Sequence, residues 1–327
     1  MSPGAGAPLP EVAWWLWIVL TLAAAAAQTA RNAMQKGLSG SLGTVGATLV
    51  RFVFGLPFAA LSLLGVLWFT GLALPAVSPA FFAWVALGGL TQIAATALML
   101  AAMRQRSFVV ATAYLKTEAI QVAVFGLVFL GEKLSAAAVA AVVAATTGVL
   151  LMSFPGRRHR QAQTATGGTA PQVSGGVSWK PVLMGLLAGS FFAGSAVGFK
   201  GAIVTVGAGG GGSGSFVLDA TFTLVCGLLL QTVLLVAWQL ARDRPVLIAM
   251  LRAWRPSLLA GLMGALASQM WFLAFAIATT AHVRTLALVE IVFAHALSRR
   301  LFSQDTTTAE LVGIALVVAG AILLING

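Results

Sequence analysis

The sequence predicts an all-α integral membrane protein of ten transmembrane helices, arranged as two inverted five-helix repeats. Three observations support this prediction. Hydrophobic residues form 59% of the 327-residue chain and charged residues only 8%. Apolar runs long enough to cross a bilayer alternate with short polar breaks. The second half of the chain also repeats features of the first half at a nearly constant spacing.

The composition excludes a soluble fold. Soluble domains carry about 25% charged residues, whereas this chain has a mean hydropathy of +0.97. A globule of this composition would expose large apolar patches to water and aggregate. Membrane lipid is therefore the expected surroundings of the folded chain.

Ten segments are apolar over about 20 residues, the length that a spanning helix needs. They are residues 13–33, 44–70, 80–103, 108–130, 136–154, 181–203, 216–240, 257–279, 282–302 and 308–326. Turn-forming or charged residues fill the breaks between them. Because most breaks are short, successive helices are expected to be antiparallel neighbours.

The first segment differs from a secretory signal peptide. Signal peptides begin with basic residues, but no Lys or Arg precedes residue 13, and Glu11 lies just before the apolar run. We therefore expect this segment to be retained as the first transmembrane helix.

A polar, basic linker at residues 155–180 divides the chain into two halves. Its Arg, Gln, Thr and Gly content is typical of a segment that forms no packed core. We expect residues 1–154 to form the first five-helix repeat and residues 181–327 to form the second.

The sequence predicts neither a cofactor nor a bound metal. Cys226 is the single cysteine, so a thiol metal cluster cannot form. The glycine-rich stretch at 207–214 lacks the Lys-Ser/Thr ending of a phosphate-binding loop. We interpret it as a flexible connector.

Alignment of the chain with itself at an offset of 172 residues matches the third to fifth segments with the eighth to tenth. Gly148 then meets Gly320, and Glu118 meets Glu290. The carboxylate match is informative because the chain has only 8 acidic residues. With five spans in each half, the second repeat enters the membrane inverted, which is an architecture of secondary transporters.

The basic residues predict the orientation. Alternating loops place fourteen Lys and Arg residues on one side and Lys133, Lys200 and Arg284 on the other. By the positive-inside rule, the 155–180 linker is cytoplasmic and both termini are periplasmic or external. Because the basic residues form short clusters between apolar runs, we do not expect nucleic-acid binding.

The two halves resemble the EamA-type repeats of the drug/metabolite transporter (DMT) superfamily. The resemblance covers nearly the whole chain and rests on the Leu-Gly-Glu-Lys-Leu-Ser turn at 130–135 and the Gly-Val-Leu-Leu ending at 148–151, which Gly-Ala-Ile-Leu at 320–323 matches. The second half has Phe-Ser-Gln-Asp at its turn, a degenerate copy, and Glu118-Ala119 stand where the family often has proline. The resemblance implies a ten-helix carrier of small organic solutes in the cell inner membrane, often an exporter.

Glu118 and Glu290 are the leading candidates for the functional site. Ionisable groups inside a membrane cost about 2.5–3.5 kcal/mol on insertion scales and usually mark function. Their equivalent positions in the repeats predict that they face each other across a cavity. We expect them to couple proton movement to solute movement or to hold an ammonium group. The alternative is a structural ion pair with Lys116 or Arg51.

Other polar residues in the spans are further candidates. Tyr114 and Gln121 share a helical face with Glu118, whereas Lys116 points away from it and needs another partner or binds an anionic group. Arg51 is expected either to hold a substrate carboxylate or to extend to the interface. The remaining candidates are Gln28 and Asn32, on a polar face of the first span, and Trp271, as a cation–π wall or as packing.

These features predict a secondary transporter that exports small zwitterionic or cationic metabolites such as amino acids by alternating access, with protons as a possible coupling ion. The alternative is a multidrug efflux transporter, which the Met, Phe and Trp content favours. A membrane-embedded enzyme is a distant third reading, because the chain has no HExxH sequence and Asp219 is the single aspartate within a span. The expected partners are the solute, membrane lipid and protons, and the assembly a monomer or homodimer.

Overall fold

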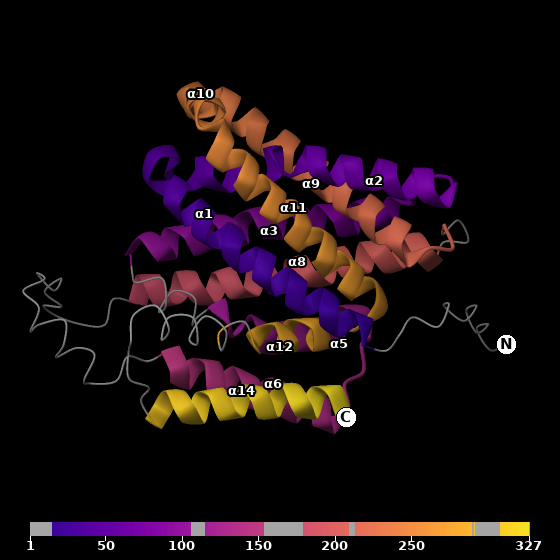
Figure 1. The fold of residues 1–327 in the computed structure, drawn as a ribbon, viewed down its shortest axis with the longest axis vertical. Coiled ribbons are helices and arrows are strands. Elements are labelled where there is room, and N and C mark those ends of the chain that lie inside the picture. Colours follow the sequence, from indigo (N-terminus) through magenta and orange to yellow (C-terminus); the bar gives the residue numbers. More distant parts are fainter. Residues whose placement is uncertain are drawn as a thin grey trace, which may run out of the picture.

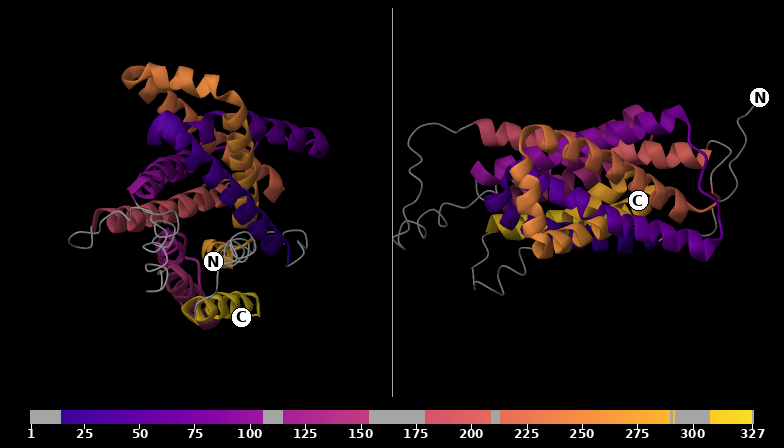
Figure 2. Two further views of the ribbon diagram at one scale, coloured as in Figure 1. Left: turned by 60° about the vertical axis from the view of Figure 1, so that its left-hand side comes forward. Right: turned by 90° about the horizontal axis from the view of Figure 1, so that it is seen from above.

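The computed structural model describes residues 15–105, 115–153, 179–208, 213–289, 291 and 308–326. These residues are almost entirely helical and contain no strand. The helices lie alongside one another and run across the long axis of the molecule (Figure 1). In the view from above, on the right of Figure 2, the helices also lie side by side. The predicted all-α class is therefore confirmed for the described part of the chain.

The described part of the first half contains five helices. They are α1 (Leu16–Val53), α2 (Leu56–Thr70), α3 (Pro79–Gln105), α5 (Glu118–Leu130) and α6 (Ala136–Ser153). The second half begins with α8 (Trp179–Ala208), α9 (Phe216–Arg242), α10 (Arg244–Arg252) and α11 (Trp254–Ile277). It continues with α12 (Thr280–Leu286), the 3₁₀ turn η1 (Ala287–Val289) and α14 (Thr308–Asn326).

The chain reverses direction within α1, at Gly43. This residue has φ +68° and ψ 178°, a conformation that favours glycine. The amide of Gln35 donates a hydrogen bond of 2.8 Å to the carbonyl of Ala47. In a straight helix these residues would be about 18 Å apart. Residues 16–42 and 44–53 are thus two arms, and the first arm extends past the predicted end at residue 33.

Five helical stretches in the described chain are long and apolar enough to cross a membrane. They are Leu16–Thr70, Pro79–Ala102, Leu183–Val206, Phe216–Arg242 and Trp254–Ile277. The apolar helices Glu118–Leu130, Ala136–Leu151 and Leu311–Ile325 are shorter. Large apolar side chains are exposed on the outside of the bundle, including Trp68 (85%) and Phe69 (88%) on α2. Such a surface indicates a membrane protein.

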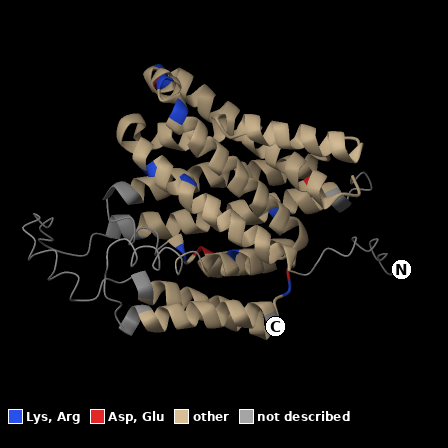
Figure 3. Cartoon of the chain, in the orientation of Figure 1, with Lys and Arg blue, Asp and Glu red and all other residues tan. Residues whose placement is uncertain are grey.

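The structure differs from the predicted segments at two places. Residues 116 and 117 form a turn, so the fourth helix begins anew at Glu118 within the predicted segment 108–130. The loop predicted between residues 240 and 257 contains the additional helix α10. Some of the Lys and Arg residues lie at the end of the molecule that carries α10, and others are scattered through the bundle (Figure 3). Helix α10 combines basic ends with exposed apolar side chains and is therefore amphipathic.

Three helix pairs form the main packing contacts: α3 with α8, α1 with α11 and α6 with α14. Glycines allow the helices of each pair to approach closely. A Cβ added to Gly198 of α8 would lie 2.6 Å from the backbone nitrogen of Gly88 of α3. A Cβ added to Gly148 of α6 would lie 2.5 Å from the carbonyl oxygen of Gly313 of α14. The interior between the first two pairs holds the buried polar side chains described below.

Candidate functional site

A small cavity lies in the interior, between α1, α3, α8, α11 and α12. Its lining consists of Gln28, Arg51, Gln92, Phe192, Ser195, Ala196, Phe199, Ser268, Trp271, Phe272, Phe275 and Arg284. The volume into which the centre of a water molecule fits is about 10 Å³, room for about one water. In this conformation the cavity is therefore too small for an organic solute.

Arg284 lies at the centre of the polar contacts. Its side chain is 9% exposed, and its Nε is 3.2 Å from Oε1 of Glu118. The guanidinium carbon is 4.4 Å from the centre of the Trp271 ring and 5.4 Å from that of Phe275. Arg284 thus combines an ion pair between α12 and α5 with cation–π contacts to α11.

The charge count placed Arg284 at the loop end of the predicted segment 282–302, whereas the structure places it inside the buried helix α12. Helix α11 ends before Ala278 and Thr279, and α12 begins at Thr280. The hydroxyl of Thr279 caps α12 by accepting a hydrogen bond from the N–H of His282. Arg284 therefore lies one turn inside a buried helix. Glu118 forms its ion pair with Arg284. The sequence had suggested Lys116 or Arg51 as the partner in a structural ion pair.

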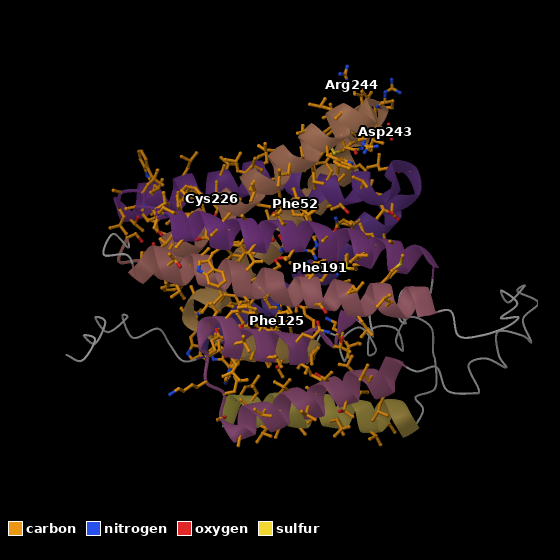
Figure 4. All side chains as sticks on the ribbon, turned by 180° about the vertical axis from the view of Figure 1, so that it is seen from behind. Phe52, Phe125, Phe191, Cys226, Asp243 and Arg244 are labelled. Carbon is orange, nitrogen blue, oxygen red and sulfur yellow. The ribbon has the colours of Figure 1, made fainter. Side chains whose placement is uncertain are left out.

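Arg51 lies near the end of α1 and lines the same cavity. It is 3% exposed, so its side chain does not extend to the membrane interface. Its Nη1 donates to the hydroxyl of Thr96 at 3.3 Å, and its guanidinium carbon is 5.2 Å from the ring centre of Phe52. Phe52 lies in the middle of the bundle, far from Asp243 and Arg244 at the α10 end (Figure 4).

Arg31 lies beside Arg51 and is 1% exposed. Its Nη2 and Nε donate to Oδ1 of Asn32, at 2.8 and 3.3 Å. Gly264 of α11 accommodates both arginines, because a Cβ at this position would be 3.3 Å from Cδ of Arg31 and 3.4 Å from Cγ of Arg51. The predicted polar face of the first helix therefore packs on α11, with Gln28 lining the cavity.

Aromatic side chains form much of the cavity lining. Trp271 is 4% exposed and stacks on Phe275 with a centroid distance of 6.1 Å. Its indole N–H donates to Oε1 of Gln28 at 3.0 Å. Phe199 of α8 and Phe272 of α11 lie 4.7 Å apart, centre to centre. The cavity lining therefore combines aromatic side chains with arginines, and Arg284 lies directly over the Trp271 ring.

The charges around the cavity are unbalanced in the described part of the chain. Arg31, Arg51 and Arg284 repel one another electrostatically, and Glu118 is the carboxylate that pairs with Arg284. Nη1 of Arg31 and Nε of Arg51 are buried and have no hydrogen-bond partner among the described residues. Such groups are costly unless an acceptor reaches them. The arrangement is suited to binding an anionic group.

Other candidates lie at different distances from this site. Lys116 is buried just before α5, and its charge interacts with Glu118 and Arg284. Gln121 is half-buried, and its amide donates to the Thr117 hydroxyl at 3.4 Å. Neither lines the described cavity. Tyr114 and Glu290 lie outside the described residues.

A second polar cluster joins three elements near the break between α11 and α12. Glu132, in the turn after α5, accepts hydrogen bonds from the backbone N–H (3.1 Å) and hydroxyl (2.7 Å) of Thr280. Lys200 of α8 donates to the carbonyl of Ala278 at 3.1 Å and to that of Phe275. These contacts fix the start of the helix that carries Arg284.

Sequence reasoning missed several residues that line the cavity. Gln92, Ser195 and Ser268 lie in long apolar helices, where single small polar residues attract little attention. Arg284 gave a stronger signal, because it is a charged residue within the predicted segment 282–302. Its assignment to a loop hid that signal.

Comparisons with known proteins identify the fold but no family. No family model and no curated protein matches this chain. A solved structure, described simply as a crystal structure of a protein, is similar with a TM-score of 0.64. The similarity covers 95% of this chain and 96% of that chain, at 13% sequence identity. The helical arrangement described here therefore occurs in an experimentally determined structure of nearly the same length.

Proposed function

We propose that this protein is a secondary membrane transporter of the EamA type, which exports small metabolites such as amino acids by alternating access. The observation that carries the proposal is the cavity at Arg51 and Arg284, enclosed by helices whose outer surfaces are apolar. Charged groups buried inside a membrane protein usually bind a solute or ion. Of the zwitterionic and cationic solutes expected from the sequence, the two arginines favour those that carry a carboxylate.

The packing of the helices supports an inverted repeat. In such a repeat α1 corresponds to α8, and α3 corresponds to α11. The contact of α3 with α8 then corresponds to that of α11 with α1, and both are extensive. Gly148 and Gly320, matched in the sequence, both lie where α6 crosses α14. A pair of repeats related in this way provides two similar conformations, one open to each side.

The positions of the chain ends support the proposed topology. The start of α1 and the end of α14 lie at the same end of the bundle, and α10 lies at the opposite end (Figure 1). Arg244 and Arg252 bound α10. By the positive-inside rule we place the α10 end in the cytoplasm and the termini outside a cell inner membrane.

Glu118 is the proposed site of proton coupling, together with its sequence counterpart Glu290. Glu118 contacts Arg284, which lines the cavity. Protonation of this carboxylate would remove its attraction for Arg284 and so change the charge that a solute meets. The solute and the proton would then influence each other through one arginine.

The test is transport in proteoliposomes, with labelled amino acids and organic cations, in the presence and absence of a pH gradient. We expect gradient-driven accumulation that is lost in the Glu118→Gln, Glu290→Gln double variant. Asp243→Asn is a matched control, because Asp243 is exposed at the far end of the bundle. Gradient-independent movement that survives the double variant would refute proton coupling. Absence of movement for every solute would refute the carrier.

The aromatic lining favours one alternative, a multidrug efflux transporter. Phe192, Phe199, Trp271, Phe272 and Phe275 could contact many apolar solutes. A multidrug transporter would move chemically unrelated cations with similar efficiency, whereas the carrier proposed here would discriminate by charge.

A further inference from the structure

The described cavity has a strongly one-sided charge. Arg51 and Arg284 line it, and no acidic residue is among its described lining. Its other polar groups are the neutral side chains Gln28, Gln92, Ser195 and Ser268. An ammonium group placed here would meet two cations and no described carboxylate in the lining, and unlike a carboxylate it could not accept their hydrogen bonds.

Arg51 and Arg284 each have N–H donors without a hydrogen-bond acceptor among the described residues. A guanidinium carries five N–H donors. Arg51 donates one bond to the Thr96 hydroxyl, and its buried Nε has no partner in the described chain. Nε of Arg284 lies 3.2 Å from Oε1 of Glu118, but it is buried and has no hydrogen-bond partner among the described residues. A carboxylate supplies the acceptors that both guanidinium groups lack, and arginine binds it in a bidentate manner.

The rest of the lining suits an apolar body. Trp271 and Phe275 stack on each other, and the Arg284 guanidinium lies over the Trp271 ring. Phe199 and Phe272 form a second contact between aromatic rings. A planar ring beside these side chains would gain contact area and favourable ring-to-ring geometry. Its carboxylate would contact the arginines.

From this juxtaposition we infer that the cavity binds small aromatic monocarboxylates through Arg51 and Arg284, and that recognition requires no ammonium group on the solute. The inference deepens the proposed function and rests on it for the role of the site in transport. It replaces a preference for zwitterions or cations with a preference for anions.

Glu118 has a positioning role in this scheme. In the present conformation it neutralises Arg284 while the cavity is too small for a solute. When the helices separate and a solute carboxylate enters, that carboxylate and Glu118 compete for the same guanidinium. Glu118→Gln should then increase the affinity for the solute and weaken its dependence on pH.

The experiment measures binding to the purified full-length protein by calorimetry, with three ligands that share a phenyl ring. These are 3-phenylpropanoate (an anion), phenylalanine (a zwitterion) and 2-phenylethylamine (a cation). We expect 3-phenylpropanoate to bind more tightly than the amine by about tenfold or more, the effect of one charged hydrogen bond. Arg51→Gln and Arg284→Gln should each weaken its binding by a similar factor.

Two controls separate recognition from folding. Arg255→Gln removes the same charge from an exposed position on α11 and should leave binding unchanged. Arg51→Lys keeps the charge and should retain more binding than Arg51→Gln. Thermal unfolding of each variant in detergent identifies those that fail to fold, and the comparison of Lys with Gln then decides the question.

The outcomes distinguish this inference from the proposed function. Stronger binding of the amine, no binding of the carboxylate, or carboxylate binding that is unaffected by both arginine substitutions would overturn the inference. Transport of amines without carboxylate binding would leave the carrier intact and refute the anion site. Carboxylate binding without transport in proteoliposomes would support the anion site and refute the carrier.

Discussion

Nε of Arg284 lies 3.2 Å from Oε1 of Glu118, although α12 and α5 belong to different halves of the chain. The same guanidinium lies over the Trp271 ring. One side chain therefore joins a carboxylate from the first half to the aromatic lining from the second. A change at any of these groups should affect the other two.

The Glu118–Arg284 pair should show strong thermodynamic coupling. Glu118→Gln leaves a buried guanidinium without its carboxylate, and Arg284→Gln leaves a buried carboxylate without its cation. Each should lower stability by about 1–3 kcal/mol. In the double variant the loss should be smaller than the sum. Thermal unfolding in detergent provides the measurement, and additive losses would show that the pair does not interact.

Close packing of α3 on α8 should make Gly198 intolerant of a side chain. Gly198→Ala would place a Cβ 2.6 Å from the backbone nitrogen of Gly88, so the two helices must separate. We expect a loss of about 1–3 kcal/mol from overpacking. Gly65→Ala on α2 is the control, because nothing lies within 4 Å of its added Cβ. That variant should be unchanged or more stable, since alanine favours helix by about 1 kcal/mol.

Glu132 should hold the start of α12 in place. Glu132→Ala removes the acceptor for the backbone N–H and hydroxyl of Thr280. Amides of residues 280–286 should then exchange hydrogen faster, by about tenfold for a loss of 1.4 kcal/mol. Hydrogen-exchange mass spectrometry measures this change. Lys133→Ala, at the exposed neighbouring position, should not alter the exchange, and unchanged exchange in Glu132→Ala would contradict the assignment.

The proposed topology predicts which thiols a membrane-impermeant reagent reaches in intact cells. In a Cys226→Ser background, Lys133→Cys should be labelled from outside. Arg252→Cys, at the end of α10, should be labelled only after the cells are opened. Both positions are exposed, so access to the reagent depends on the side of the membrane. The reverse pattern would invert the orientation.

The sequence was sufficient to predict the helical class of the described residues, because apolar runs are local features. The role of Glu118 stays a prediction. The sequence did not reveal the partner of Glu118. That contact depends on the break at Ala278 and Thr279, where a capping hydroxyl starts a new helix and buries Arg284. Helix α10 was also missed, since its nine residues are too short and too polar to resemble a span.

The glycine at position 264 illustrates a second limit of the sequence. In the chain it is one of 36 glycines, with nothing to distinguish it from those that serve helix packing. In the structure it provides the space through which Arg31 and Arg51 pass beside α11. Such a role depends on the side chains of another helix, which a local pattern does not contain.

The helix breaks gain a mechanical meaning from their positions. Arg51 precedes the interruption at Phe54 and Gly55, Arg284 follows that at Ala278 and Thr279, and Glu118 adjoins the turn at residues 116 and 117. Each interruption is a place where the helix can bend with less cost than in its regular part. Bending at one of these interruptions would move the adjacent charged side chain relative to the cavity. The electrostatic character of the cavity would then change with the same movement that opens it.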